Sequence, residues 1–248
     1  MILLIYLRWV RAPLPTPREW RNALLVGTLM LGCGMGLTAY AEQSVASGLV
    51  VVFIAVVPAL TILMALPFGP RPSRTEVLGI ALALLGVLWL ARGSGFGTSP
   101  TGLVAMALAS LGWCLGSILS QYRFQLAPGI AGFFSEMLCG GAVLLVLSLL
   151  MRESVQWPPQ ASAALAWLYL VVFGSLIAFT AYMTLLAQTR LAVSTSYTLV
   201  NPLVALLLGV TVGHETVTAH EWWAATLVLL GVVVLFVGKQ AAAKRRHA

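Results

Sequence analysis

Eight apolar stretches make up most of this chain, and the charged residues lie almost entirely between them. A helix rises about 1.5 Å per residue and a bilayer core is about 30 Å thick, so one span needs roughly 20 apolar residues. We interpret seven of the stretches as long enough to cross a membrane and the eighth as nearly long enough. They are 22–41, 48–68, 76–91, 101–122, 130–150, 161–187, 193–213 and 222–238. The pattern predicts a polytopic protein of the lipid bilayer.

The predicted fold class is all-α, a polytopic membrane helical bundle. Backbone groups in lipid must pair within a helix or a closed barrel, and these runs are continuous rather than alternating. The composition agrees, with 60% hydrophobic and 8% charged residues. Residues 1–11 are apolar but too short to span, and we interpret them as the remainder of a further helix.

The positive charges predict the orientation, because loops rich in Lys and Arg stay in the cytoplasm. With the segment before residue 22 inside, the inner loops and tail hold twelve of the fourteen basic residues, and the outer loops hold only Arg92 and Arg152. The C-terminus is therefore predicted to be cytoplasmic. The net charge of +7 then reflects topology, which argues against a nucleic-acid partner.

No motif of an enzyme or a cofactor site is found. His214 and Glu215 resemble the start of a zinc motif, but His220 follows the first histidine by six residues instead of four, so no metal site is predicted. The three cysteines lie inside apolar stretches and are interpreted as packing residues. We expect neither cofactor nor catalysis, since no nucleophile and base occur together at membrane depth.

The chain also contains an internal repeat. The residues around Pro58 match those around Pro202 at an offset of 144, and Leu85-Gly86-Val87 matches Leu230-Gly231-Val232 at 145. The predicted topology inverts the two copies. Inverted repeats interrupted near mid-membrane are typical of secondary transporters, so Pro58 and Pro202 are predicted helix kinks near a substrate site. The alternative is that both prolines are merely tolerated.

The offset also predicts the domain organisation. If a second repeat of five helices occupies 101–248, ending in the basic tail, the matching start of the first repeat falls before residue 1. Residues 1–100 are then an incomplete first repeat that lacks its first helix and most of its second.

Several segments together resemble the EamA family of the drug/metabolite transporter superfamily, and within it the YedA-like inner-membrane exporters. They are AEQSVASG (41–48), SLGWCLGS (110–117), AGFFSEMLCGG (131–141), FGSLIAFTAYM (173–183), SYTLVNPLVALLLG (196–209) and GHETVTAHEW (213–222). The resemblance implies ten helices in two inverted five-helix repeats. It also implies export of amino acids, metabolites or toxic compounds by alternating access across the inner (plasma) membrane.

Polar and aromatic residues at helical spacing predict a substrate cavity, because such a face in lipid should point inward. The predicted cavity residues are Gln43, Trp113, Ser117, Glu136, Tyr182, Tyr197 and Asn201. The alternative for the small hydroxyl residues is that they mediate helix packing.

Two carboxyl groups are candidates for a proton or cation site. Glu136 lies about 9 Å into its helix, where desolvation favours the neutral acid, so it could carry a coupling proton or pair with a cationic substrate. The alternative is a neutral acid that hydrogen-bonds between helices. Glu42 lies at the outer boundary, where a solvated carboxylate costs little, and is a weaker candidate for the same proton or cation site.

The sequence therefore predicts a small-molecule secondary transporter and favours an exporter. An importer or passive facilitator of similar solutes is an alternative within transport. A non-transporting membrane scaffold or degenerate fragment is an alternative outside it, and would leave no continuous cavity. The sequence predicts neither the substrate nor the oligomeric state.

Overall fold

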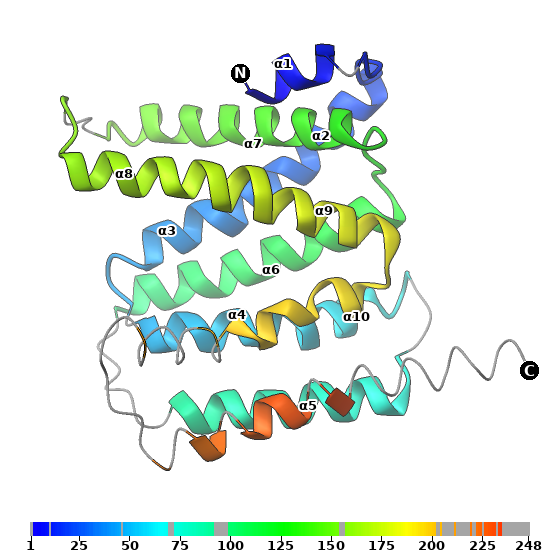
Figure 1. The fold of residues 1–248 in the computed structure, drawn as a ribbon, viewed down its shortest axis with the longest axis vertical. Coiled ribbons are helices and arrows are strands. Elements are labelled where there is room, and N and C mark those ends of the chain that lie inside the picture. The colour runs from blue at the N-terminus through cyan, green and yellow to red at the C-terminus, as the bar shows by residue number, and fades with distance from the viewer. Residues whose placement is uncertain are drawn as a thin grey trace, which may run out of the picture.

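The computed structural model describes residues 2–9, 11–45, 47–68, 72–91, 99–153 and 157–201. Beyond Asn201 it describes 204, 211, 219, 222–224, 226–231, 233 and 234. All regular elements in these ranges are helices, and Figure 1 shows most of the longer ones running across the view side by side, with Pro17–Ala41 inclined to them.

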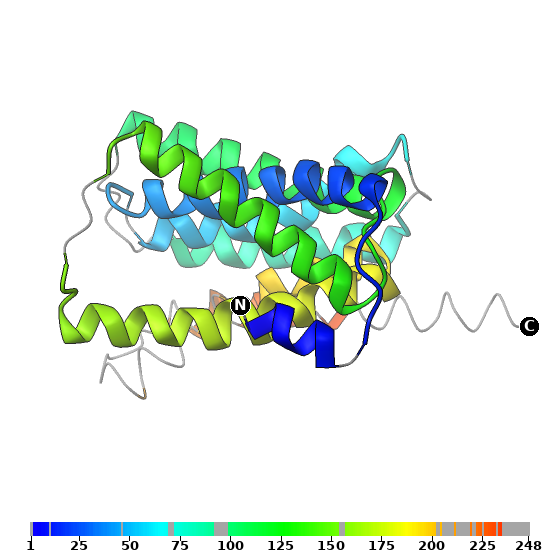
Figure 2. The same cartoon turned by 90° about the horizontal axis from the view of Figure 1, so that it is seen from above.

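The elements follow the predicted spans closely. In order they are α1 (Ile2–Trp9), α2 (Pro17–Gly27), η1 (Thr28–Gly36), α3 (Leu37–Ala41), α4 (Ser47–Ala65), α5 (Arg74–Ala91), α6 (Pro100–Tyr122), α7 (Ile130–Leu150), α8 (Ala161–Tyr169), η2 (Leu170–Ala178), α9 (Phe179–Gln188), α10 (Leu191–Ser194) and η3 (Ser196–Leu199). The helical rod from α2 to α3 is continuous, as is that from α8 to α9. In Figure 2, α7 crosses α2 obliquely.

Among the described residues, four helices are long and apolar enough to cross a membrane: Pro17–Ala41, Pro100–Tyr122, Ile130–Leu150 and Ala161–Gln188. Large apolar side chains on their outer faces, such as Leu145, Leu149 and Leu165, are more than half exposed. Such a surface is stable only in lipid. The predicted fold class, an all-α polytopic bundle, is confirmed.

The helices begin where the sequence supplies caps. Ser99 precedes Pro100, and its hydroxyl accepts the Gly102 N–H at 3.0 Å, so it caps the start of α6. Ser73 and Glu76 form a reciprocal capping box at the start of α5. Both caps give partners to the first N–H groups of a helix, which have none within the helix itself.

The described helices contain irregularities in addition to the predicted proline positions. Two stretches have π-helical hydrogen bonding, Thr28–Gly36 and Leu170–Ala178. Pro58 is buried within α4, which remains helical to Ala65. The stretch predicted as one helix over 193–213 is interrupted early, because α10 ends at Ser194 and the 3₁₀ turn η3 begins at Ser196. Pro202 lies outside the described residues.

Polar contacts connect segments that the alternating topology places on one side. At one end of the bundle, the Asn22 side chain donates to the Gln125 carbonyl at 2.9 Å. At the other end, the Ser99 hydroxyl donates to that of Ser44 at 2.8 Å. Each pair joins residues that are far apart in the chain and that the predicted topology places on the same side of the membrane.

The repeat-matched glycines Gly86 and Gly231 form reciprocal contacts between α5 and the helical residues Trp222–Gly231. A Cβ on Gly86 would lie 2.8 Å from the Val228 nitrogen and 2.9 Å from the Ala224 carbonyl oxygen. A Cβ on Gly231 would lie 2.6 Å from the Gly79 carbonyl oxygen and also against the Ala83 nitrogen. The two sets of contacts interchange under the offset of 145, as expected for antiparallel helices related by a two-fold axis.

Replacing Gly231 with valine is expected to destabilise the protein by about 2 kcal/mol, because the new side chain would displace the backbone of α5. A thermal-stability assay in detergent should show a melting temperature lower by about 4–8 °C. The matched control is Gly141→Val, since a Cβ there meets nothing within 4 Å. Equal melting temperatures for the two variants would contradict the close helix contact.

Candidate functional site

A cavity of about 150 Å³ lies between α3, α4, α6 and the segment that follows α10. Its wall combines apolar side chains with hydroxyl, amide and aromatic groups. The lining residues are Gly34, Met35, Thr38, Ile54, Val57, Met106, Ala109, Ser110, Trp113, Tyr197, Thr198 and Asn201. None of these side chains is charged, so the cavity offers hydrogen bonds and ring faces rather than ion pairs.

Two pairs of lining residues are equivalent under the repeat offset. Ile54 and Val57 of α4 correspond to Thr198 and Asn201, each 144 positions later. The same two positions of each copy therefore face one cavity. The first copy supplies apolar groups and the second supplies a hydroxyl and an amide, which gives the cavity an amphipathic wall.

An aromatic cluster adjoins the cavity. The Trp113 ring lies 5.2 Å from that of Tyr182 and 6.2 Å from that of Phe179, and Tyr182 lies 5.5 Å from Tyr197, in each case between ring centroids. These separations are those of favourable ring pairs. Because the rings come from α6, α9 and η3, they couple the cavity wall to three segments.

Hydrogen bonds fix the helices behind the cluster. The Ser117 hydroxyl lies 2.7 Å from both the Trp113 carbonyl oxygen and the Tyr182 hydroxyl. Since the carbonyl can only accept, Ser117 donates to it and Tyr182 donates to Ser117. One turn further along α6, the Gln121 amide donates to the carbonyl oxygens of Leu186 and Thr189. These bonds tie α6 to α9.

Glu136 is fully buried in α7, and neither carboxyl oxygen has a hydrogen-bond partner among the described residues. A charged carboxylate in that position would be an unpaired buried ion, which costs several kcal/mol. The α2 helix approaches closely here, since a Cβ on Gly27 would lie 2.8 Å from the Glu136 carbonyl oxygen. The Glu136 backbone therefore lies at the α2–α7 interface, with its side chain buried and without a partner among the described residues.

The structure separates the predicted site residues into three groups. Trp113, Tyr197 and Asn201 line the cavity. Ser117 and Tyr182 are buried behind Trp113, and Glu136 lies on α7, outside the cavity lining. Gln43 and Glu42 are exposed beyond the end of α3.

The sequence reasoning did not identify Thr38, Ile54, Val57 or Met106 as lining residues. Apolar lining side chains are indistinguishable by type from those that face lipid. The signal available for Ile54 and Val57 was the repeat itself, because the offset of 144 maps Thr198 and Asn201 onto them.

Within the described part of the chain, no group of three or more His, Cys, Asp or Glu side chains could hold a metal ion. A helical membrane bundle around a small cavity with polar and aromatic walls is the architecture of a small-molecule transporter.

The EamA-like transporter family matches residues 1–92 and 100–237 of the chain. The protein belongs to this family, and it is a membrane transporter of the drug/metabolite transporter superfamily.

Relatives and a solved structure agree. The inner membrane transporter YedA of Escherichia coli (strain K12) is 37% identical over 240 residues, 96% of this chain and 78% of YedA. A Salmonella typhimurium protein named "Probable amino-acid metabolite efflux pump" is 25% identical over 70% of this chain and 62% of its own length. A crystal structure that is 19% identical shares the fold, with a TM-score of 0.63, over 90% of this chain and 88% of that one.

Proposed function

We propose that the protein exports small amphipathic metabolites, such as amino acids or drug-like compounds, across the inner membrane by alternating access. The observation that carries the proposal is the cavity between repeat-equivalent positions. Inverted repeats place the substrate site at their interface near mid-membrane, where rocking of one repeat against the other exposes it to either side. The two repeats are residues 1–100 and 101–248, and the C-terminus is cytoplasmic.

The cavity chemistry supports this class of substrate. The hydroxyl of Thr198 and the amide of Asn201 can orient a polar group, while Ile54, Val57 and the Trp113 ring contact an apolar one. Because the lining has no cation to pair with an anion, uncharged or zwitterionic solutes are favoured over anionic ones. The name of YedA supports a location in the inner membrane, and the name of the Salmonella efflux pump supports export as the direction of transport.

Proton coupling is the second part of the proposal. Glu136 is the buried, unpartnered acid, and intramembrane acids of this kind serve proton relays in transporters. Glu42 is exposed and is not included in the relay.

Growth protection tests the proposal. Cells that express the chain should tolerate higher concentrations of at least one member of a panel of amino acids, metabolites and cationic drugs. Asn201→Leu should remove that protection, because the cavity then loses its amide. The control is Gln160→Leu, whose side chain is exposed and makes no cap bond at the start of α8. Sensitisation instead of protection would indicate import, and protection unaffected by Asn201→Leu would place the site elsewhere.

A further inference from the structure

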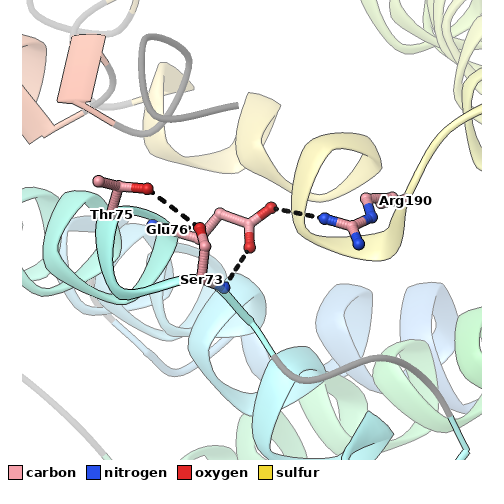
Figure 3. A network of polar contacts seen from close by, with 4 residues as sticks. All are labelled: Ser73, Thr75, Glu76 and Arg190. Carbon is pink, nitrogen blue, oxygen red and sulfur yellow. Dashed lines mark hydrogen bonds and ion pairs between the residues drawn. The ribbon is translucent and has the colours of Figure 1, made fainter. Parts of the chain in front are cut away.

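One ion pair joins the start of α5 to the start of α10. The Arg190 Nη1 atom lies 3.6 Å from Oε1 of Glu76, as Figure 3 shows. The Glu76 side chain is 4% exposed and that of Arg190 is 41% exposed. The pair is thus shielded on one side, and it crosses from the first repeat to the second.

Two hydrogen bonds with Ser73 orient Glu76 independently of the arginine. Its Oε2 accepts the Ser73 N–H at 2.7 Å, while its own N–H donates to the Ser73 hydroxyl at 3.2 Å. The capping box therefore leaves Oε1 directed at Arg190 without further loss of side-chain freedom. A preorganised partner makes the ion pair stronger than one between two mobile surface chains.

Arg190 stands at the entrance to the segment that reaches the cavity. It is the N-cap residue of α10, and α10 and η3 both contact α4. Ser194, Thr195 and Thr198 are buried along this path, and Tyr197 and Thr198 then line the cavity. The regular helix is interrupted between α10 and η3, so the first turn and the part that lines the cavity are separate elements.

The other face of the membrane lacks an equivalent pair in sequence. The counterpart of Glu76 at the offset of 145 is Glu221, but the counterpart of Arg190 at its offset of 144 is Ala46. Residues 42–48 contain no lysine or arginine. The repeat-equivalent of this ion pair is thus absent from the sequence on the other side, which makes this contact asymmetric between the two end states.

We propose that the Glu76–Arg190 pair is a latch that closes the cytoplasmic side of the cavity and biases the protein toward its outward-facing state. The latch rests on the proposed transport function and its topology. When the pair breaks, α10 moves away from α5 and opens a route from the cytoplasm along the buried face of residues 191–198. Each transport cycle therefore includes the opening of this ion pair.

Cysteine alkylation tests the latch without a substrate. A Ser194→Cys reporter is placed in the full chain with the three native cysteines changed to alanine, and inside-out vesicles are treated with a membrane-impermeant maleimide. Ser194 is fully buried, so the reporter should react slowly. Glu76→Gln, which preserves a capping-box acceptor, and Arg190→Gln should each raise the rate roughly fivefold. The double variant should show no further rise, because both changes remove one interaction.

Two variants serve as controls. Arg74→Gln removes an exposed cation from the same end of α5, and Ser73→Ala removes the capping hydroxyl without removing the charge pair. The latch is overturned if neither charge-removing variant changes the rate, if Arg74→Gln raises it equally, or if the rise occurs only with reagent on the opposite face. Accelerated alkylation in a chain that protects against no compound would uphold the latch and refute the proposed export.

Discussion

Replacing Glu136 with glutamine is expected to uncouple transport from a proton gradient. Under the proposed proton coupling, a gradient of one pH unit supports about a tenfold concentration ratio of solute per proton exchanged by the wild type. Glutamine is similar in shape but cannot release a proton, so the ratio should fall to about one. Labelled solute and imposed pH gradients in vesicles, prepared with a compound identified by growth protection, measure this ratio directly.

Stability separates this effect from misfolding. The Glu136 side chain is buried without a hydrogen-bond partner among the described residues, so a neutral amide of similar shape should leave the melting temperature nearly unchanged. The control is Glu42→Gln, an exposed carboxylate beyond the end of α3, which should retain full coupling. Gradient-driven accumulation by Glu136→Gln at the wild-type level would show that the proton is carried elsewhere.

Replacing Trp113 with alanine is expected to have the second large effect, on both transport and stability. The ring lines the cavity, packs on Phe179 and Tyr182, and lies against Gly34, where a Cβ would be 3.0 Å from its Cε3 atom. Removing a large aromatic side chain from such surroundings costs about 3–5 kcal/mol. Growth protection should be lost, and a thermal-stability assay should show a substantially lower melting temperature.

Two further variants divide these effects. Trp113→Phe keeps a ring in the cluster and should recover most of the stability while transport selectivity changes, because the cavity becomes larger and loses the indole N–H. Trp167→Ala removes an exposed tryptophan of α8 and should alter neither property. If Trp113→Ala melted like the wild type and still gave protection, the ring would be neither a cavity wall nor a structural anchor.

The sequence predicted the course of the chain well, because the hydrocarbon layer sets a minimum length for each apolar run. The ranges 101–122 and 130–150 differ from α6 and α7 by no more than one residue at either end. Local hydrogen bonding was less predictable. The π-helical stretch at Thr28–Gly36 includes the three glycines of GCGMG, which are a sequence signal for irregular helix. The stretch Leu170–Ala178 has a single glycine, Gly174, and so carries no comparable signal.

The candidate site was predictable only where polarity marks it. Trp113, Tyr197 and Asn201 stand out as bulky polar residues in apolar helices, and all three line the cavity. Their apolar counterparts across it, such as Ile54, carry no such mark. Helical spacing also could not predict that Glu136 lies outside the cavity lining. That placement depends on how α7 packs against α2 rather than on position within α7.

The reciprocal contacts of Gly86 and Gly231 bear on which parts of the protein can move. Backbone packed directly on backbone has no side chains that can change rotamer and permit sliding. The helix α5 and residues 222–231 should therefore travel together as a single rigid strut. Because each half contributes one member of this strut, the repeats would rock about it, and the remaining helices would bend and tilt to expose the cavity.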